Sequence, residues 1–158
     1  MTLDKSRLLG LGLGATVLAA AGLLLRLQGD ASATSLEPGN PQLVQRGAAV
    51  YASSCAACHG AKLEGQRDWR RRRADGKLPA PPHDASGHTH HHPDRLLIKL
   101  TKLGPAAVAG EGYESDMPAY ADVLSDTDIR AVLSYIKSTW PVELQRRHDA
   151  INAQAAEQ

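Results

Sequence analysis

Cys55, Cys58 and His59 stand in a C-x-x-C-H spacing, and the chain contains no other cysteine. Each thiol can add to one vinyl group of a haem, and the adjacent histidine can then bind the iron. Positions i, i+3 and i+4 share one face of a helical turn, so a single turn can hold both the macrocycle edge and the metal. The spacing therefore predicts covalent attachment of one haem c.

Other chemistries of a C-x-x-C pair fit this chain less well. A thioredoxin-type redox pair needs a surrounding βαβ pattern, which the sequence does not show. A zinc site needs further ligands, and there is no second cysteine pair. A disulfide between residues three apart closes a very short loop and stabilises little. Haem attachment is the favoured interpretation.

A second axial ligand is predicted at Met117, the one methionine after the N-terminal segment. It precedes Pro118, which restricts the backbone that must present the sulfur. A His59/Met117 ligand pair raises the reduction potential relative to two histidines. The competing ligands are His83, His88, His90, His91 and His92. A state with two histidine ligands therefore stays open.

Three predicted helices position these ligands. The first begins at Asn40-Pro41, an N-cap followed by proline, and runs into the haem motif. The second, between residues 93 and 104, carries a stripe of leucines and stops at a Gly-Pro pair. The third follows Ser125, which with Asp128 resembles a capping pair. The methionine lies in the loop between the second and third helices.

The N-terminus carries an apolar run from Leu8 to Leu25. A helix of that length would span about 27 Å, close to the thickness of a bilayer core. Ala31-Ser32-Ala33 follows with the form of a cleavage site. Residues 1–33 are therefore either a signal peptide or a membrane anchor, and both export the remainder to the periplasmic side.

The exported part is long enough for one domain. We expect a linker at residues 34–39, a domain at 40–141 and a polar tail at 142–158, either a frayed helix or a disordered segment. After residue 33, 15 Lys and Arg balance 15 Asp and Glu. Nucleic-acid binding is not expected, because the exported part is neutral and no recognition pattern accompanies its arginines.

With these motifs in place, the chain resembles class I (mitochondrial-type) cytochrome c over roughly residues 40–141. The resemblance rests on the haem motif, on Met117-Pro118, and on a closing helix that ends in Ser134-Tyr135-Ile136-Lys137. Gly47 and Tyr51 correspond to the small and aromatic positions of the family's first helix. Residues 78–93 look like an insertion found in some small bacterial membrane-associated members.

The resemblance implies an all-α fold with three to five helices around one covalently bound haem. It implies that His59 and Met117 are the axial ligands of the iron. It also implies that a proline carbonyl accepts the Nδ1 hydrogen of the proximal histidine. The candidate acceptors are Pro79, Pro81 and Pro82, and the sequence does not choose among them.

Two further patterns have alternative interpretations. The histidine-rich loop, which carries His83, His88, His90, His91 and His92, is either a copper or zinc site or, as we favour, a polar loop near the haem. Residues 62–77 are net basic, whereas residues 111–128 carry six acidic and no basic side chains. These charges are either solvated loops or a dipole that orients the protein towards partners.

The function expected from these features is electron transfer by a monohaem carrier rather than enzymatic catalysis. Its redox partners would be a bc1-type donor and a terminal oxidase or reductase, and the N-terminus would associate it with the membrane. One alternative is a haem enzyme or enzyme subunit in which Met117 is displaceable. The other is a metal-handling or sensor protein that uses the histidine-rich loop.

Overall fold

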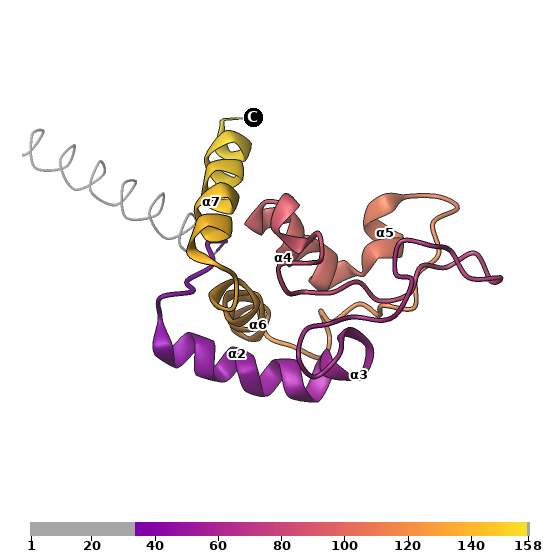
Figure 1. Ribbon diagram of the computed structural model, residues 1–158, viewed down its shortest axis with the longest axis horizontal. Helices are drawn as coiled ribbons and strands as arrows, with labels where there is room; N and C mark the ends of the chain where they lie inside the picture. Colours follow the sequence, from indigo (N-terminus) through magenta and orange to yellow (C-terminus); the bar gives the residue numbers. More distant parts are fainter. Residues whose placement is uncertain (1–33, 158) are drawn as a thin grey trace, which may run out of the picture. The chain divides into compact units, whose positions relative to one another are not determined.

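A computed structural model describes residues 34–157, so the predicted signal peptide or anchor lies outside the described residues. These residues form six α-helices and one 3₁₀ turn, without a strand (Figure 1). The elements are α2 (Pro41–Ser54), α3 (Ala56–His59), η1 (Thr89–His91), α4 (Asp94–Leu103), α5 (Pro105–Ala109), α6 (Asp126–Ser138) and α7 (Val142–Ala156). The predicted all-α fold is confirmed. Across residues 34–157, every helix is too short or too polar to cross a membrane.

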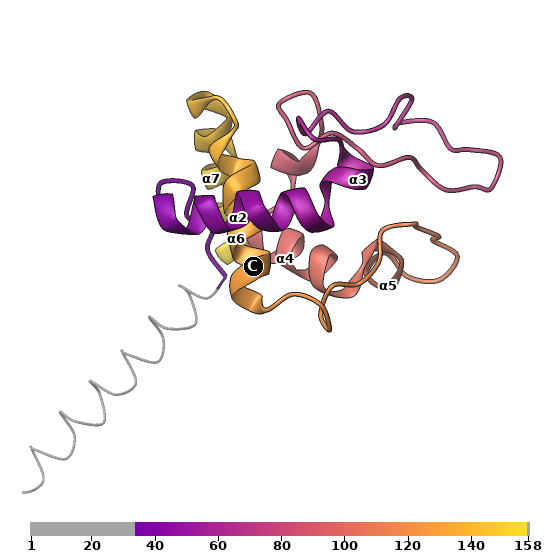
Figure 2. The ribbon, with the colours of Figure 1, turned by 90° about the horizontal axis from the view of Figure 1, so that it is seen from below.

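Helices α2 and α6 cross in direct contact (Figure 2). Gly47 lies at this contact. A Cβ atom at Gly47 would lie 2.0 Å from the carbonyl oxygen of Ala131 and 2.8 Å from the Cβ of Tyr135. No side chain larger than hydrogen fits in that space. One turn further along α2, the ring of Tyr51 packs on the ring of Tyr135 at 5.6 Å between centroids. The glycine and the two tyrosines together fix this crossing.

The core is built mainly on α6, which contacts α2 and α4 and buries residues on most of its circumference. Because the chain has no phenylalanine, aliphatic side chains fill most of this core. The buried apolar residues are Leu36, Tyr51, Leu63, Leu97, Ile129, Ala131, Val132, Leu133, Ile136 and Trp140. A large apolar cofactor would therefore add much buried apolar surface to this core.

The ends of the main helices follow from local chemistry. The Asn40 side chain accepts a hydrogen bond from the Leu43 N–H at 3.1 Å, and proline occupies the first position of α2. Ser125 and Asp128 form a reciprocal capping box at the start of α6. Gly104, at φ 79°, ends α4 in the left-handed region. The proline that follows Gly104 begins a further helix, α5, where the sequence indicated only a loop.

Helix α7 extends through most of the region expected to be a polar tail. It is held by side chains that meet distant backbone groups rather than by an apolar stripe. His148 Nε2 lies 2.8 Å from the carbonyl oxygen of His92, and the Asn152 side chain accepts from the Asp94 N–H at 2.7 Å. Lys137 on α6 pairs with Asp149 at 2.6 Å. These bonds account for an ordered helix in a polar sequence.

Residues 35–39, which make up most of the linker expected at 34–39, lie against the domain. The Leu36 side chain is buried, and the Leu36 N–H donates to Asp94 Oδ2 at 2.9 Å. The Glu37 N–H donates to Ser134 Oγ at 2.9 Å, and the Glu37 carboxylate pairs with Arg130. The segment that leads into α2 is therefore fastened to α4 and α6.

Candidate haem-attachment site

Cys55, Cys58 and His59 lie on one continuous turn. The Cys55 N–H still donates to the carbonyl of Tyr51 in α2, and the His59 N–H donates to the carbonyl of Cys55, both at 2.9 Å. The two thiols are free: Cys58 is exposed and Cys55 is half-buried. Burial raises the pKa of Cys55 to about 11, so its thiol is protonated at neutral pH. This is the arrangement that the spacing predicts.

The imidazole of His59 is buried and oriented by one backbone oxygen. Its Nδ1 lies 2.8 Å from the carbonyl oxygen of Pro81. Because a carbonyl only accepts, Nδ1 carries the hydrogen and Nε2 presents its lone pair. Burial lowers the pKa of His59, against the opposing effect of the bond to Pro81, and so favours the neutral ring that can bind a metal. Among the three candidate prolines, the acceptor is Pro81.

Two backbone contacts hold the Pro81 carbonyl in place. The Gln66 N–H donates to the Ala80 carbonyl at 2.8 Å, and the His83 N–H donates to the Leu63 carbonyl at 2.8 Å. The next residue, Pro82, lies close to Gly87. A Cβ atom at Gly87 would be 2.0 Å from the carbonyl oxygen of Pro82. The loop that supplies the acceptor is thus tied on both sides of Pro81.

The Tyr51 side chain binds the backbone at Gly60, the residue directly after the haem motif. The Tyr51 hydroxyl donates to the Gly60 carbonyl at 2.9 Å, with the His59 carbonyl 3.3 Å away. Gly60 has φ 82°, a conformation that turns the chain away from α3. Tyr51 therefore links the α2–α6 crossing to the turn that bears His59.

His83 is a second imidazole at this site. Its ring stacks on the ring of His59, with 4.0 Å between centroids and 23° between planes. Its Nδ1 lies 2.8 Å from the Thr89 hydroxyl, and its carbonyl accepts from the Trp140 indole at 2.8 Å. Burial keeps the pKa of His83 well below its ordinary value, so this neighbour of the proximal ring is neutral. Its parallel packing on the His59 ring was not apparent from the sequence.

Met117 lies half-buried in the loop between α5 and α6. Tyr120, three residues later, ties this loop to the haem motif: its hydroxyl donates to the carbonyl of Ser54 at 2.6 Å. Its pKa is raised by burial and by the charges of Cys55 and Cys58. The structure thus brings the Met117 segment beside the two cysteines, while ligation by its sulfur stays a prediction.

The two oppositely charged stretches meet directly. Asp116, the residue before Met117, pairs with Arg73 and, at 2.6 Å, with Lys77. These two bases hold the pKa of Asp116 below its usual range. The Arg72 guanidinium lies over the Tyr113 ring, 5.7 Å from its centroid. The basic loop, residues 62–77, therefore contacts the methionine loop, residues 110–125. The net charge of each segment did not reveal this arrangement.

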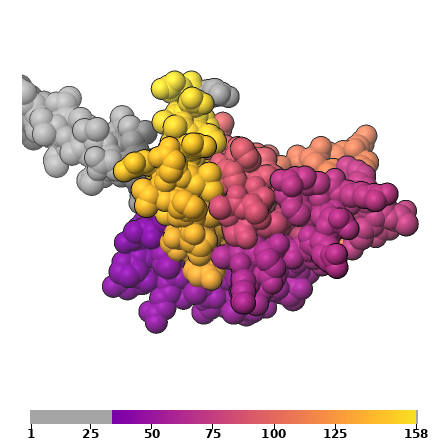
Figure 3. Space-filling model, in the orientation of Figure 1, coloured from indigo at the N-terminus to yellow at the C-terminus, as the bar shows by residue number. Residues whose placement is uncertain are grey.

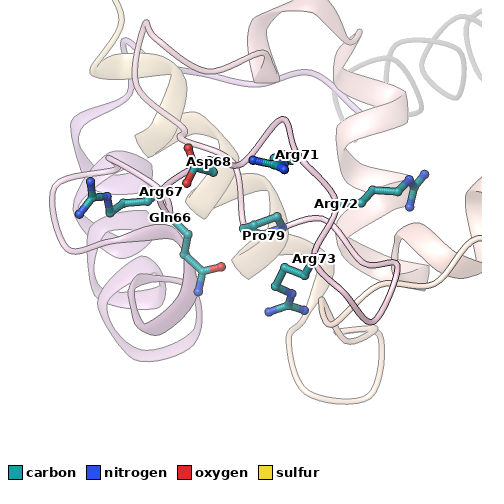
Figure 4. Close-up of a pocket in the computed structure, with 7 residues that line it drawn as sticks. All are labelled: Gln66, Arg67, Asp68, Arg71, Arg72, Arg73 and Pro79. Carbon is teal, nitrogen blue, oxygen red and sulfur yellow. The ribbon is translucent and has the colours of Figure 1, made fainter.

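Arg67, Arg71, Arg72 and Arg73 of the basic loop line a surface depression without converging on it. Figure 4 shows Arg67 and Arg72 pointing away from the depression in opposite directions, while Arg71 lies near its rim. A site for one small anion needs donors aimed at a common point. The arrangement is that of a solvated basic surface. In Figure 3, the magenta part of the chain, which includes these residues, lies at one end of the domain.

The histidine-rich loop packs through its rings. His88 stacks on Trp69 with 5.2 Å between centroids, and His90 meets the edge of Trp140 at 5.9 Å. Within residues 34–157, no three side chains of the kinds that bind metals are grouped to hold an ion. The histidine rings therefore pack on the two tryptophans, and η1 of this loop lies against α7.

The donor set fits a covalently bound haem c, because it offers two free thiols and an imidazole with an available Nε2 lone pair. The family model described as Cytochrome c matches residues 44–140. The chain belongs to the cytochrome c family. It is therefore a haem c electron-transfer protein.

A curated relative gives the same assignment. The chain is 32% identical over 114 residues to the gluconate 2-dehydrogenase cytochrome c subunit of Pantoea cypripedii. That alignment covers 72% of this chain and 24% of the relative, so the aligned region spans about a quarter of the relative's length. No solved structure matches significantly.

Proposed function

We propose that this cytochrome is a single-haem electron carrier in which His59 and Met117 are the axial ligands of the iron. The observation that carries the proposal is the hydrogen bond from Tyr120 to Ser54, at 2.6 Å. Ser54 directly precedes Cys55, and Tyr120 follows Met117 by three residues. This bond brings the methionine segment to the attachment motif.

One haem per chain follows from the one attachment motif in the sequence. When bound, haem c supplies iron that exchanges one electron at a time. The chain's own residues hold its surroundings fixed. The Nδ1–H of His59 is held by Pro81, and the Met117 segment is held by Tyr120. Ligands that are fixed in advance rearrange little when the charge of the metal changes, which favours electron transfer over binding of a substrate.

The partners of such a carrier are other redox proteins. The curated relative is, by its name, a cytochrome subunit of a dehydrogenase, so a dehydrogenase joins a bc1-type complex as a candidate donor. A terminal oxidase or reductase is the proposed acceptor. We place the domain on the periplasmic side of the membrane, supported by the apolar segment from Leu8 to Leu25. The mass of the membrane-extracted protein tests both the haem count and the processing of residues 1–33.

Substitution of Met117 by alanine tests the ligand assignment. The Met117→Ala holoprotein should lose the sulfur-to-iron charge-transfer band of the ferric protein, and its reduction potential should fall, because the thioether favours ferrous iron. Absorption spectra and a redox titration measure both effects. A matched control is Val123→Ala, which removes an exposed apolar side chain from the same loop and should change neither.

Two results would contradict the proposal. An unchanged spectrum in Met117→Ala would remove Met117 from the iron. A high-spin ferric spectrum in the unsubstituted protein that shifts on adding peroxide would favour the alternative of a haem enzyme.

A further inference from the structure

Asp116 is held by two bases that lie about forty residues earlier in the chain. Arg73 and Lys77 belong to the loop between α3 and η1, whereas Asp116 belongs to the loop between α5 and α6. Figures 1 and 2 both draw these two loops on the same side of the domain. The two ion pairs join segments about forty residues apart in the chain, and they meet at the residue next to the proposed ligand.

We propose that Asp116, Arg73 and Lys77 form a clasp that positions the Met117 loop and limits how often the methionine sulfur leaves the iron. The proposal rests on Met117 being a ligand, as proposed above. Asp116 does not touch the metal site, so it acts as a positioning residue. Its effect is on ligand exchange rather than on the chemistry of the iron.

The geometry around Asp116 favours a clasp over two incidental surface pairs. Both carboxylate oxygens are used: Oδ1 by Lys77 at 2.6 Å and Oδ2 by Arg73. Arg73 also contacts Asp75 at 3.3 Å, within its own loop. A carboxylate bridged by two bases from one loop resists movement better than a carboxylate in a single exposed pair.

A second contact joins the same two loops. The Arg72 guanidinium lies over the ring of Tyr113, with 5.7 Å to the centroid. Apart from these two contacts, few interactions hold the methionine loop to the basic loop. Met117 itself has one local hydrogen bond, from its N–H to the Ser115 hydroxyl at 3.1 Å. On the other side, Tyr120 holds the loop to α2 and to the end of α4. Loss of the clasp therefore leaves Met117 tethered on one side only.

The test measures how fast cyanide binds to the ferric holoprotein, since cyanide can enter only after the sulfur has left. Asp116→Asn should speed cyanide binding about threefold to tenfold, the range expected for two exposed ion pairs. The double variant Arg73→Gln/Lys77→Gln should give the same increase. Adding Asp116→Asn to that double variant should increase the rate no further, because all three residues act as one unit.

The matched control is Arg46→Gln. Arg46 pairs with Asp128 at 2.7 Å and is similarly exposed, but it joins α2 to α6 and does not touch the methionine loop. Its rate of cyanide binding should equal that of the unsubstituted protein. Asp116→Glu, which keeps the charge, should restore most of the slow rate.

Ionic strength provides an independent measurement. Raising the salt concentration from about 10 mM to about 0.5 M should speed cyanide binding to the unsubstituted protein and leave Asp116→Asn unchanged, since salt screens exposed pairs. Equal salt dependence in both proteins would overturn the proposal. So would a rate in Asp116→Asn equal to that in Arg46→Gln.

Hydrogen exchange separates this proposal from the ligand assignment. Backbone amides of residues 111–120 should exchange faster in Asp116→Asn than in Arg46→Gln, whether or not Met117 binds the iron. If Met117→Ala leaves the spectrum unchanged, the ligand assignment fails, and unchanged exchange in Asp116→Asn would then overturn the clasp itself. If Asp116→Asn does not mature, the Arg73→Gln/Lys77→Gln variant decides by the same two measurements.

Discussion

A carbonyl group in a conformationally restricted, proline-rich segment orients the proximal histidine, His59. The carbonyl of Pro81 takes the Nδ1 hydrogen of His59 at 2.8 Å, and Pro79 and Pro82 lie on either side of it. Proline fixes φ and removes a donor, so this stretch has few conformations and cannot follow the imidazole if the ring rotates. The bond therefore holds the ring to one orientation and sets its donor strength towards iron.

Tyr120 is the residue whose single hydrogen bond joins the methionine segment to the cysteine motif. Tyr120→Phe keeps the ring and removes the bond to the Ser54 carbonyl, which should lower the free energy of unfolding by about 1 kcal/mol. Denaturant unfolding of the holoprotein followed by circular dichroism measures this. In the same titration, the charge-transfer band should disappear at a lower denaturant concentration than in the unsubstituted protein.

Tyr113→Phe is the matched control for that substitution. Tyr113 presents the face of its ring to Arg72, a contact that phenylalanine preserves. Its stability should stay close to that of the unsubstituted protein. Equal stability losses in the two variants would show that the Tyr120 hydroxyl does not hold the loop.

At the residue scale, the attachment motif could be predicted from sequence because its spacing alone determines which side chains share a turn. The choice of Pro81 over Pro79 and Pro82 could not. It depends on where the Leu63 and Gln66 contacts hold the loop, and those are long-range bonds. The contacts of Asp116 could not be predicted for the same reason, because charges counted along the chain do not show which of them form ion pairs.

At the scale of elements, α2 and α6 form the most extensive helix–helix contact of the described residues. A Cβ at Gly47 would overlap the Ala131 carbonyl, whose oxygen lies 2.0 Å away. This overlap involves backbone, which cannot move aside as a flexible side chain can. The crossing angle and separation of the two helices therefore depend on one missing methyl group.

Gly47→Ala tests this dependence. In a helix free of contacts, alanine would stabilise by about 1 kcal/mol over glycine. Here the overlap should reverse the sign and cost about 1–3 kcal/mol of unfolding free energy. Ala49→Gly, at an exposed position of the same helix, measures the propensity difference alone. A Gly47→Ala protein that is more stable than the original would mean that the helices are not in close contact.

The helices differ in how well the sequence predicted them. The starts of α2, α4 and α6 were predicted at the right places, because their caps and prolines act within a few residues. Helix α7 was left open between a frayed helix and disorder, because its one fully buried side chain is His148, whose partner, the His92 carbonyl, is 56 positions away. No apolar periodicity marks such a helix.

At the scale of the whole molecule, five buried or partly buried histidines give the domain a common response to acid. Burial lowers the pKa of His83, His88, His90, His92 and His148. For each, the unfolded chain binds a proton at a higher pH than the folded chain does. Stability is therefore full above the ordinary histidine pKa of about 6.5 and falls as the pH drops below it.

His148 provides the cleanest test of this response, because it is fully buried and lies away from the proposed iron ligands. The groups around it are Asp94 on α4, Lys137 on α6, Asp149 on α7, and His90 and His92 from the histidine-rich loop. Burial and Lys137 lower its pKa, against the carbonyl of His92 and the two carboxylates. The net shift is downward, so protonation opposes folding.

Unfolding free energies measured between about pH 7.5 and pH 5 should fall as the solution is acidified. His148→Gln can still donate to the His92 carbonyl but cannot gain a proton, so its stability should depend less steeply on pH. A His148→Gln protein with the original slope would show that the buried imidazole does not contribute.

The contacts of Asp94 have a mechanical consequence. Its carboxylate receives the N–H of Leu36 as the polypeptide enters the domain, and its own N–H is bound by Asn152 near the far end of α7. Asp94, the first residue of α4, therefore joins the segment that leads into the domain to helix α7. Tension applied through either of these segments would act on the two hydrogen bonds of Asp94 before it reached the haem motif. A tether could therefore pull on the protein without disturbing its haem site.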